Sequence, residues 1–243
     1  MNKLPLHIKF SHHYDPLTMQ EELNSCLKHE WPLHFKTSDF EGSWKTISLR
    51  SASGAMEDIF AHPEINGYHD TPLLAKTPYI KSIIDSWKCD KEAVRLLSLA
   101  PGSVIKPHKD YGCSYKSGFF RIHIPLLTNE GVYFTVGDER LQLKEGECWY
   151  MDFSTTHSIV NDGKSDRVHL IIDGIRNSWT DQLFEQHGYH INDRQYDDLT
   201  QAGMIAELER MNTDVARAII VNLKLNNTLP NDLSVPPAKL DSH

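Results

Sequence analysis

Residues 119–136 read FFRIHIPLLTNEGVYFTV, in which two short apolar runs flank the turn-forming residues Asn129-Glu130-Gly131. The same pattern of short apolar runs separated by turn residues extends in both directions, from Ala93 to Asp173. Short strands at regular spacing, with no helical pattern between them, predict an antiparallel β-barrel or sandwich. The predicted strands are 94–99, 119–127, 132–136, 140–143, 147–153, 158–160 and 168–172.

Helical patterns flank this β region on both sides. Asp15-Pro16 is typical of an N-cap followed by proline at the first helical position, and it predicts a helix over residues 15–30. Further predicted elements are a strand over 44–50, a helix that starts near Thr71-Pro72, and helices over 193–224 with a tail from Asn226. The expected parts of the chain are an N-terminal α/β flank (1–92), a β core (93–180) and a C-terminal helical region and tail (181–243).

The composition narrows the class of partner. A formal net charge of −8 over 243 residues argues against nucleic acid and against an anionic membrane surface. It does not argue against a small acidic molecule, because local arginines set the field inside a pocket. No segment approaches the ~20 apolar residues of a membrane span, and residues 1–10 lack the apolar region of a signal peptide. The four cysteines are widely spaced and read as reduced thiols, so we expect a cytoplasmic protein.

Three His-x-Asp/Glu patterns are candidates for metal binding: His13-Tyr14-Asp15, His62-Pro63-Glu64 and His108-Lys109-Asp110. Asp15 is better explained as a helix N-cap, and His62 lies in a segment rich in proline, asparagine and glycine. Only His108 ends a strand-like run inside the β region. Since residues i and i+2 of an extended segment face the same side, His108 and Asp110 can face one ion.

His157, near the start of a later predicted strand, is the candidate for a third ligand. Two histidines and one carboxylate form the ligand set of a non-haem Fe(II) centre that keeps positions open for substrate and O₂. Zinc remains an alternative because it also accepts histidine and aspartate. The absence of a cysteine ligand pattern favours iron.

Arg167 is placed by a predicted hairpin whose turn is Asn161-Asp162-Gly163. A three-residue loop pairs Arg167 with Ile159 and puts it on the same face as His157, whereas a two-residue loop puts it on the opposite face. A guanidinium that points toward the metal can bind a carboxylate through two hydrogen bonds.

Arg121 and His123 are again spaced i and i+2, so they present a second cation and a hydrogen-bonding ring on one face. The alternative for this pair is a structural salt bridge and a buried histidine.

As a set, these residues resemble the aspartyl/asparaginyl β-hydroxylase family of Fe(II)- and 2-oxoglutarate-dependent dioxygenases. The resemblance is strongest from Arg95 to Asp173. The matching motifs are Ala100-Pro101-Gly102, Pro107-His108-Lys109-Asp110, Arg121-Ile122-His123, Gly146-Glu147-Cys148-Trp149, and His157 followed by Arg167.

This resemblance implies a double-stranded β-helix, the jelly roll of cupin-like barrels, with the metal at one mouth. The implied iron ligands are His108, Asp110 and His157. Arg167 is implied to bind the distal carboxylate of 2-oxoglutarate, His123 to contact this co-substrate, and Arg121 to bind co-substrate or substrate. The implied cofactors are Fe(II), 2-oxoglutarate and O₂, with ascorbate supporting activity.

The substrate implied by the resemblance is a small amino acid or a related carboxylate. Phe119 stands where the vertebrate peptidyl-aspartyl enzyme has an arginine, and that enzyme lacks a carboxylate at the position of Asp110. The motifs are closer to the bacterial branch, which includes free-proline cis-hydroxylases. We expect Arg121 to anchor the substrate carboxylate and Phe119 and Trp149 to form apolar walls. The alternatives are a peptidyl aspartyl/asparaginyl β-hydroxylase, a non-catalytic metal-binding cupin module, and a zinc hydrolase, although no H-E-x-x-H motif is present.

Overall fold

The computed structural model describes residues 4–60, 67–191, 198–213, 216–217, 219–221 and 223. The chain forms two compact units, Met1–Tyr189 and His190–His243. The second unit contains α4 (Asp198–Met211), which lies within the predicted helical stretch. The tail predicted from Asn226 lies outside the described residues.

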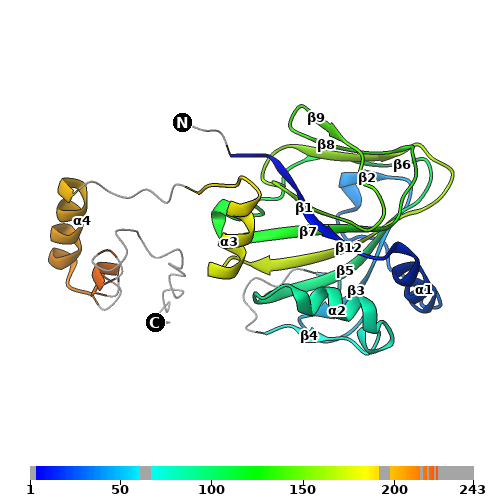
Figure 1. The fold of residues 1–243 in the computed structure, drawn as a ribbon, viewed down its shortest axis with the longest axis horizontal. Helices are drawn as coiled ribbons and strands as arrows, with labels where there is room; N and C mark the ends of the chain where they lie inside the picture. The colour runs from blue at the N-terminus through cyan, green and yellow to red at the C-terminus, as the bar shows by residue number, and fades with distance from the viewer. Residues whose placement is uncertain are drawn as a thin grey trace, which may run out of the picture. The chain divides into compact units, whose positions relative to one another are not determined.

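Two antiparallel sheets form the first unit and lie as facing layers (Figure 1). The larger sheet has the order β1-β10-β7-β12-β5-β3-β4, and the smaller has the order β2-β6-β11-β8-β9. Within them, β10-β7-β12-β5 and β6-β11-β8-β9 follow the strand order of a double-stranded β-helix, so the predicted mainly-β fold is confirmed. The strands are β1 (His7–His13), β2 (Phe40–Glu41), β3 (Trp44–Ser51), β4 (His69–Asp70), β5 (Lys91–Leu99), β6 (Ser103–His108), β7 (Phe119–Leu127), β8 (Val132–Val136), β9 (Glu139–Leu141), β10 (Glu147–Met151), β11 (His157–Asn161) and β12 (Arg167–Ile175).

The helices of this unit follow the local signals of the sequence in part. α1 (Pro16–Cys26) starts as predicted, with the Asp15 carboxylate accepting the N–H of Leu17. α2 (Pro78–Ser86) starts later than predicted, because Leu74–Lys76 closes only a 3₁₀ turn. α3 (Ser178–Gln186) and β1 were not predicted, although a capping box between Asn177 and Thr180 marks the start of α3.

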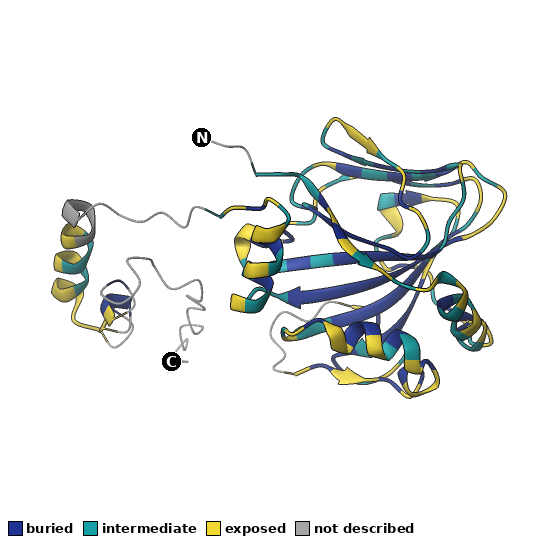
Figure 2. Ribbon diagram, in the orientation of Figure 1, coloured by how far each residue is buried: buried dark blue, intermediate teal, exposed yellow. Residues whose placement is uncertain are grey.

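The two faces of β7 contact different parts of the protein. Phe120 lies on one face and contacts Trp87 at the end of α2 and Phe184 of α3, with ring centroids 5.9 and 5.6 Å away. Arg121 and His123 lie on the opposite face, which lines a cavity between the sheets. The inner strands are accordingly buried along most of their length (Figure 2).

The predicted hairpin between β11 and β12 is wrong. β11 pairs with β6 and β8 in the smaller sheet, whereas β12 pairs with β5 and β7 in the larger one. The segment around Gly163 therefore crosses from one sheet to the other. A Cβ at Gly163 would lie 1.8 Å from the Asn129 Oδ1 atom, so a larger residue would force the Asn129 side chain to move.

Two further features bear on the class of protein. No helix among the described residues combines the length and apolar character needed to cross a bilayer. All four cysteines are free thiols.

Candidate metal and anion site

The two histidines of the predicted ligand set face each other across neighbouring strands. His108 ends β6 and His157 starts β11, and these residues are direct partners in the antiparallel register. Their ring centroids are 4.2 Å apart. Asp110 follows β6 and is held by its backbone N–H, which donates to the carbonyl of Phe153 at 2.9 Å. One ligand atom from each of His108, Asp110 and His157 lies within 4.8 Å of the other two.

Hydrogen bonds to the backbone orient both rings for metal binding. The Nδ1 atom of His108 lies 2.7 Å from the carbonyl of Lys106, and that of His157 lies 3.0 Å from the carbonyl of Thr155. Because a carbonyl only accepts, each Nδ1 carries the proton and each Nε2 keeps a free lone pair. Burial, together with His108, lowers the pKa of His157 to about 4, which keeps this ring neutral.

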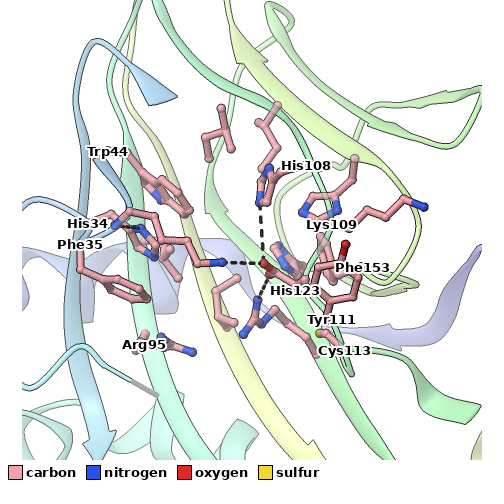
Figure 3. Close-up of a pocket in the computed structure, with 18 of the residues that line it drawn as sticks. His34, Phe35, Trp44, Arg95, His108, Lys109, Tyr111, Cys113, His123 and Phe153 are labelled. Atoms are coloured by element: carbon pink, nitrogen blue, oxygen red, sulfur yellow. Dashed lines mark hydrogen bonds and ion pairs between the residues drawn. The ribbon is translucent and has the colours of Figure 1, made fainter. Parts of the chain in front are cut away.

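Asp110 completes the ligand set as a carboxylate. Burial alone raises its pKa, but Arg121 and Lys36 outweigh burial and the resulting pKa is lowered. The Nζ atom of Lys36 donates to Oδ1 and Nη1 of Arg121 donates to Oδ2, each at 3.0 Å. Figure 3 shows the pocket around this carboxylate, with His108 and His123 among its lining residues. Two neutral imidazoles and one ionised carboxylate fit a divalent ion of the Fe(II) type and leave other coordination positions free.

Arg121 forms more ion pairs than the sequence indicates. Its Nε and Nη2 atoms donate to the two carboxylate oxygens of Asp173 at 2.6 and 3.1 Å. Asp173 in turn accepts a hydrogen bond from Arg95, which is also buried. Arg121 therefore connects Asp110 to a buried Arg95–Asp173 pair. This geometry favours a positioning role for Arg121 over the expected role as a free anchor for a ligand carboxylate.

Arg167 has the opposite environment. Its side chain is 1% exposed and lines the cavity, yet it forms no ion pair with an acidic group in the part of the chain that the structure describes. Its guanidinium contacts Nδ1 of His169 at 2.9 Å and the ring of Phe134, whose centroid lies 4.9 Å from Cζ. Burial lowers the pKa of Arg167 to about 9. A desolvated guanidinium of this kind is stabilised by a bound anion.

His123 lies beside this guanidinium. Its Nδ1 atom is 3.4 Å from Nδ1 of His169, and its buried Nε2 atom has no partner among the described residues. Burial, then Arg167 and Arg121, lower the pKa of His123 well below its usual value. The free Nε2 atom leaves His123 able to bond to a ligand in the cavity.

A cavity of about 460 Å³ is lined by these groups, with the candidate metal ligands on β6, β11 and the loop after β6, and with Arg121 and Arg167 on the larger sheet. Phe119 lines this cavity. Trp149 does not: it is buried in the hydrophobic core, and its indole N–H donates to Oε2 of Glu147. The expectation that Trp149 forms a wall of the substrate pocket is therefore corrected.

His13 and Asp15, which form the first of the other two His-x-Asp/Glu patterns, do not line this cavity. Asp15 caps α1 as predicted, and its carboxylate also accepts the hydroxyl of Thr18. His62 and Glu64 lie outside the described residues.

Four groups in or beside the cavity were missed by the sequence analysis. Lys36 reaches Asp110 from a loop 74 residues away in the chain, and no local pattern announces such a contact. Arg95 and Asp173 did carry a signal, since a charged residue inside an apolar strand must find a partner when it is buried. His34 also lines the cavity and stacks on Trp44, with ring centroids 3.6 Å apart.

Comparison with known proteins gives a consistent set of similarities. The profile of the Aspartyl/Asparaginyl beta-hydroxylase family matches residues 15–177. The chain is 29% identical over 164 residues to the L-proline cis-4-hydroxylase of Rhizobium meliloti (strain 1021), covering 66% of this chain and 57% of that protein. It is 26% identical over 136 residues to L-proline cis-3-hydroxylase 1 of a Streptomyces species, covering 54% and 47%. The chain thus spans about half the length of these curated relatives.

Similarity to solved structures is weaker. A Pseudomonas putida prolyl-4-hydroxylase superposes with a TM-score of 0.44 at 10% identity, covering 71% of this chain and 94% of that one. The viral collagen prolyl hydroxylase of Paramecium Bursaria Chlorella virus-1 gives a TM-score of 0.43 at 11% identity, covering 70% and 97%.

Proposed function

Because the chain belongs to the aspartyl/asparaginyl β-hydroxylase family, we propose that it is an Fe(II)- and 2-oxoglutarate-dependent dioxygenase that hydroxylates an unactivated C–H bond of a small amino acid. The observation that carries this proposal is the buried Arg167, which has no acidic partner among the described residues and shares a cavity with the three metal-binding residues. A metal site that only stabilises a fold needs no such anion-binding group.

Each residue has a defined task in this proposal. His108, Asp110 and His157 hold Fe(II), and Arg167 binds the distal carboxylate of 2-oxoglutarate, with His123 beside it. When bound, the iron supplies O₂ activation coupled to the decarboxylation of 2-oxoglutarate to succinate and CO₂. The protein orients both reactants and excludes water from the cavity. Ascorbate supports turnover by keeping the iron reduced.

The cavity also bears on the substrate. Its apolar walls include Phe119, Leu97 and Ile171, which suit a small aliphatic body. The curated relatives are named as hydroxylases of L-proline, so L-proline is the first compound to test. Free cysteines throughout support a reducing compartment, and we place the enzyme in the cytoplasm.

The decisive experiment is an anaerobic titration of 2-oxoglutarate into the protein with and without Fe(II). We expect binding that depends on Fe(II), followed by succinate release when O₂ and ascorbate are added. His108→Ala and His157→Ala should abolish both, because each removes one of three protein ligands. Asp110→Ala should strongly reduce both 2-oxoglutarate binding and succinate release. The exposed His13→Ala is the matched control and should behave as the unaltered protein.

The same assay distinguishes the alternatives. Metal binding without any affinity for 2-oxoglutarate would leave a non-catalytic cupin-type module. Succinate release stimulated only by peptides that contain aspartate or asparagine would restore the peptidyl β-hydroxylase. A screen of free amino acids beside such peptides therefore decides the substrate class.

A further inference from the structure

One acidic side chain of the cavity has no part in the metal or anion site. Glu92 lies near the start of β5 and lines the same cavity as Arg95 and Leu97. Its direction follows from a β-bulge. Ile172 pairs with Val94 but Gly174 pairs with Lys91, so β5 carries one extra residue at this point. Bulges of this kind re-aim side chains, and this one turns Glu92 to the face occupied by Arg95 and Leu97.

The carboxylate of Glu92 differs from its acidic neighbours in having no partner. Asp110 accepts from Lys36 and Arg121, and Asp173 accepts from Arg95 and Arg121. Glu92 is only half-exposed, yet it forms no hydrogen bond or ion pair with any residue that the structure describes. It is the one carboxylate lining the cavity, within the described chain, that is left for a ligand.

The electrostatics around Glu92 call for a cation. Burial and the nearby Asp173 raise the pKa of its carboxyl and outweigh Arg95 and Arg121, which lower it, so the charged form of Glu92 is disfavoured where it stands. A positively charged group brought next to it would restore that charge and gain a charge-assisted hydrogen bond. Arg95 lies on the same strand but is committed to Asp173 and to the carbonyl of Ile59.

We propose that Glu92 binds the protonated amino or imino group of the substrate. This inference rests on the proposed hydroxylase function and sharpens its substrate class to molecules that carry a cationic nitrogen. A free amino acid has one, whereas an aspartate or asparagine inside a peptide has a neutral amide nitrogen. Glu92 thus becomes a specificity-determining residue that selects free amino acids over peptides.

The test compares free and N-acetylated forms of one amino acid in the loaded enzyme. L-Proline and N-acetyl-L-proline are the first pair; if neither stimulates succinate release, the pair is built on the free amino acid that does. The unaltered enzyme should prefer the free form. Glu92→Gln should lower kcat/KM for the free form about ten- to a hundredfold, since a hydrogen bond to a charged group is lost. It should leave kcat/KM for the acetylated form unchanged.

Controls separate this proposal from the parent function. Fe(II)-dependent 2-oxoglutarate binding should be the same in Glu92→Gln and in the unaltered protein. Glu92→Asp keeps the charge and should recover part of the lost preference, while the exposed Glu30→Gln should change nothing. Equal use of both forms by the unaltered enzyme, stimulation by no free amino acid, or an unchanged preference in Glu92→Gln would each overturn the proposal. Each of these results leaves the dioxygenase assignment standing if 2-oxoglutarate still binds.

Discussion

Arg167 places a guanidinium in the protein interior with no acidic group to balance it among the described residues. Such a charge costs folding free energy that ligand binding later recovers. We predict that Arg167→Met raises the free energy of unfolding of the ligand-free protein by about 1–3 kcal/mol, as measured by urea denaturation. The same variant should lose 2-oxoglutarate binding.

Arg95→Met is the matched comparison. Arg95 is equally interior but shares the carboxylate of Asp173, so its loss leaves a buried acid with one cation fewer. This variant should be destabilised by about 1–3 kcal/mol. Two changes of the same kind, in neighbouring strands, should therefore move stability in opposite directions. A loss of stability in Arg167→Met would show that the guanidinium is structural.

Residue types and spacings predicted most of the candidate site. His108, Asp110 and His157 come together because two of them are spaced i and i+2 and the third lies opposite on the next strand. The partners of Arg121 could not be predicted in the same way. Asp173 is 52 residues away, and only the pairing of β7 with β12 brings the two side chains together.

At the scale of the secondary-structure elements, the connection between β11 and β12 is anchored by Asn161, the last residue of β11, whose side chain forms several hydrogen bonds. Asn161 is fully buried, and its amide donates to the carbonyls of Leu99 and Ser165 at 2.9 and 3.0 Å. Its Oδ1 atom accepts from the N–H of Gly163 and from the side chain of Asn129. These bonds fix the point at which the chain leaves one sheet for the other, just before Arg167.

Asn161→Ala should lower the free energy of unfolding by about 3 kcal/mol, because it strands several buried donors and acceptors at once. It should also weaken 2-oxoglutarate binding, because β12 begins at Arg167. Urea denaturation and the anaerobic titration measure the two effects. The exposed Asn24→Ala in α1 is the control and should stay within about 0.5 kcal/mol. A similar small change in Asn161→Ala would contradict this view of the connection.

The same connection shows why part of the fold escaped prediction. Asn161-Asp162-Gly163 has the composition of a hairpin turn, and turn chemistry is local. Which sheet the following strand joins depends on distant partners, here β5 and β7, and no short pattern encodes that choice. Arg167 reaches the cavity nonetheless, because the inner faces of both sheets line it.

At the scale of the whole molecule, four buried histidines in the described part of the chain couple folding to pH. Burial lowers the pKa of His34 to about 3 and of His157 to about 4, and it lowers the pKa values of His123 and His169 well below their usual range. In the unfolded chain these rings titrate near pH ~6.5. As the pH falls below that value, the unfolded state therefore binds protons that the folded state does not.

We predict that the metal-free protein loses stability steadily from about pH 6.5 downward, by up to about 1.4 kcal/mol per pH unit for each of these histidines. Urea denaturation at a series of pH values down to about 4.5 measures the slope. His34→Phe keeps the stack on Trp44 and removes one titrating ring. Its free energy of unfolding should therefore fall less steeply with pH, by the contribution of one proton, about 1.4 kcal/mol per pH unit. A stability that stays constant to pH 5 would contradict the prediction.

The division of the site between two sheets means that a ligand bound there would contact both of them. The candidate metal ligands belong to β6, β11 and the loop after β6, while Arg167 and His123 belong to β12 and β7. A small diacid held by the metal at one end and by Arg167 at the other would act as a cross-link between two layers that the chain itself joins only through loops. The two layers could then separate only after the diacid is released. Under the proposed function, 2-oxoglutarate would therefore also stabilise the packing of the two sheets against each other.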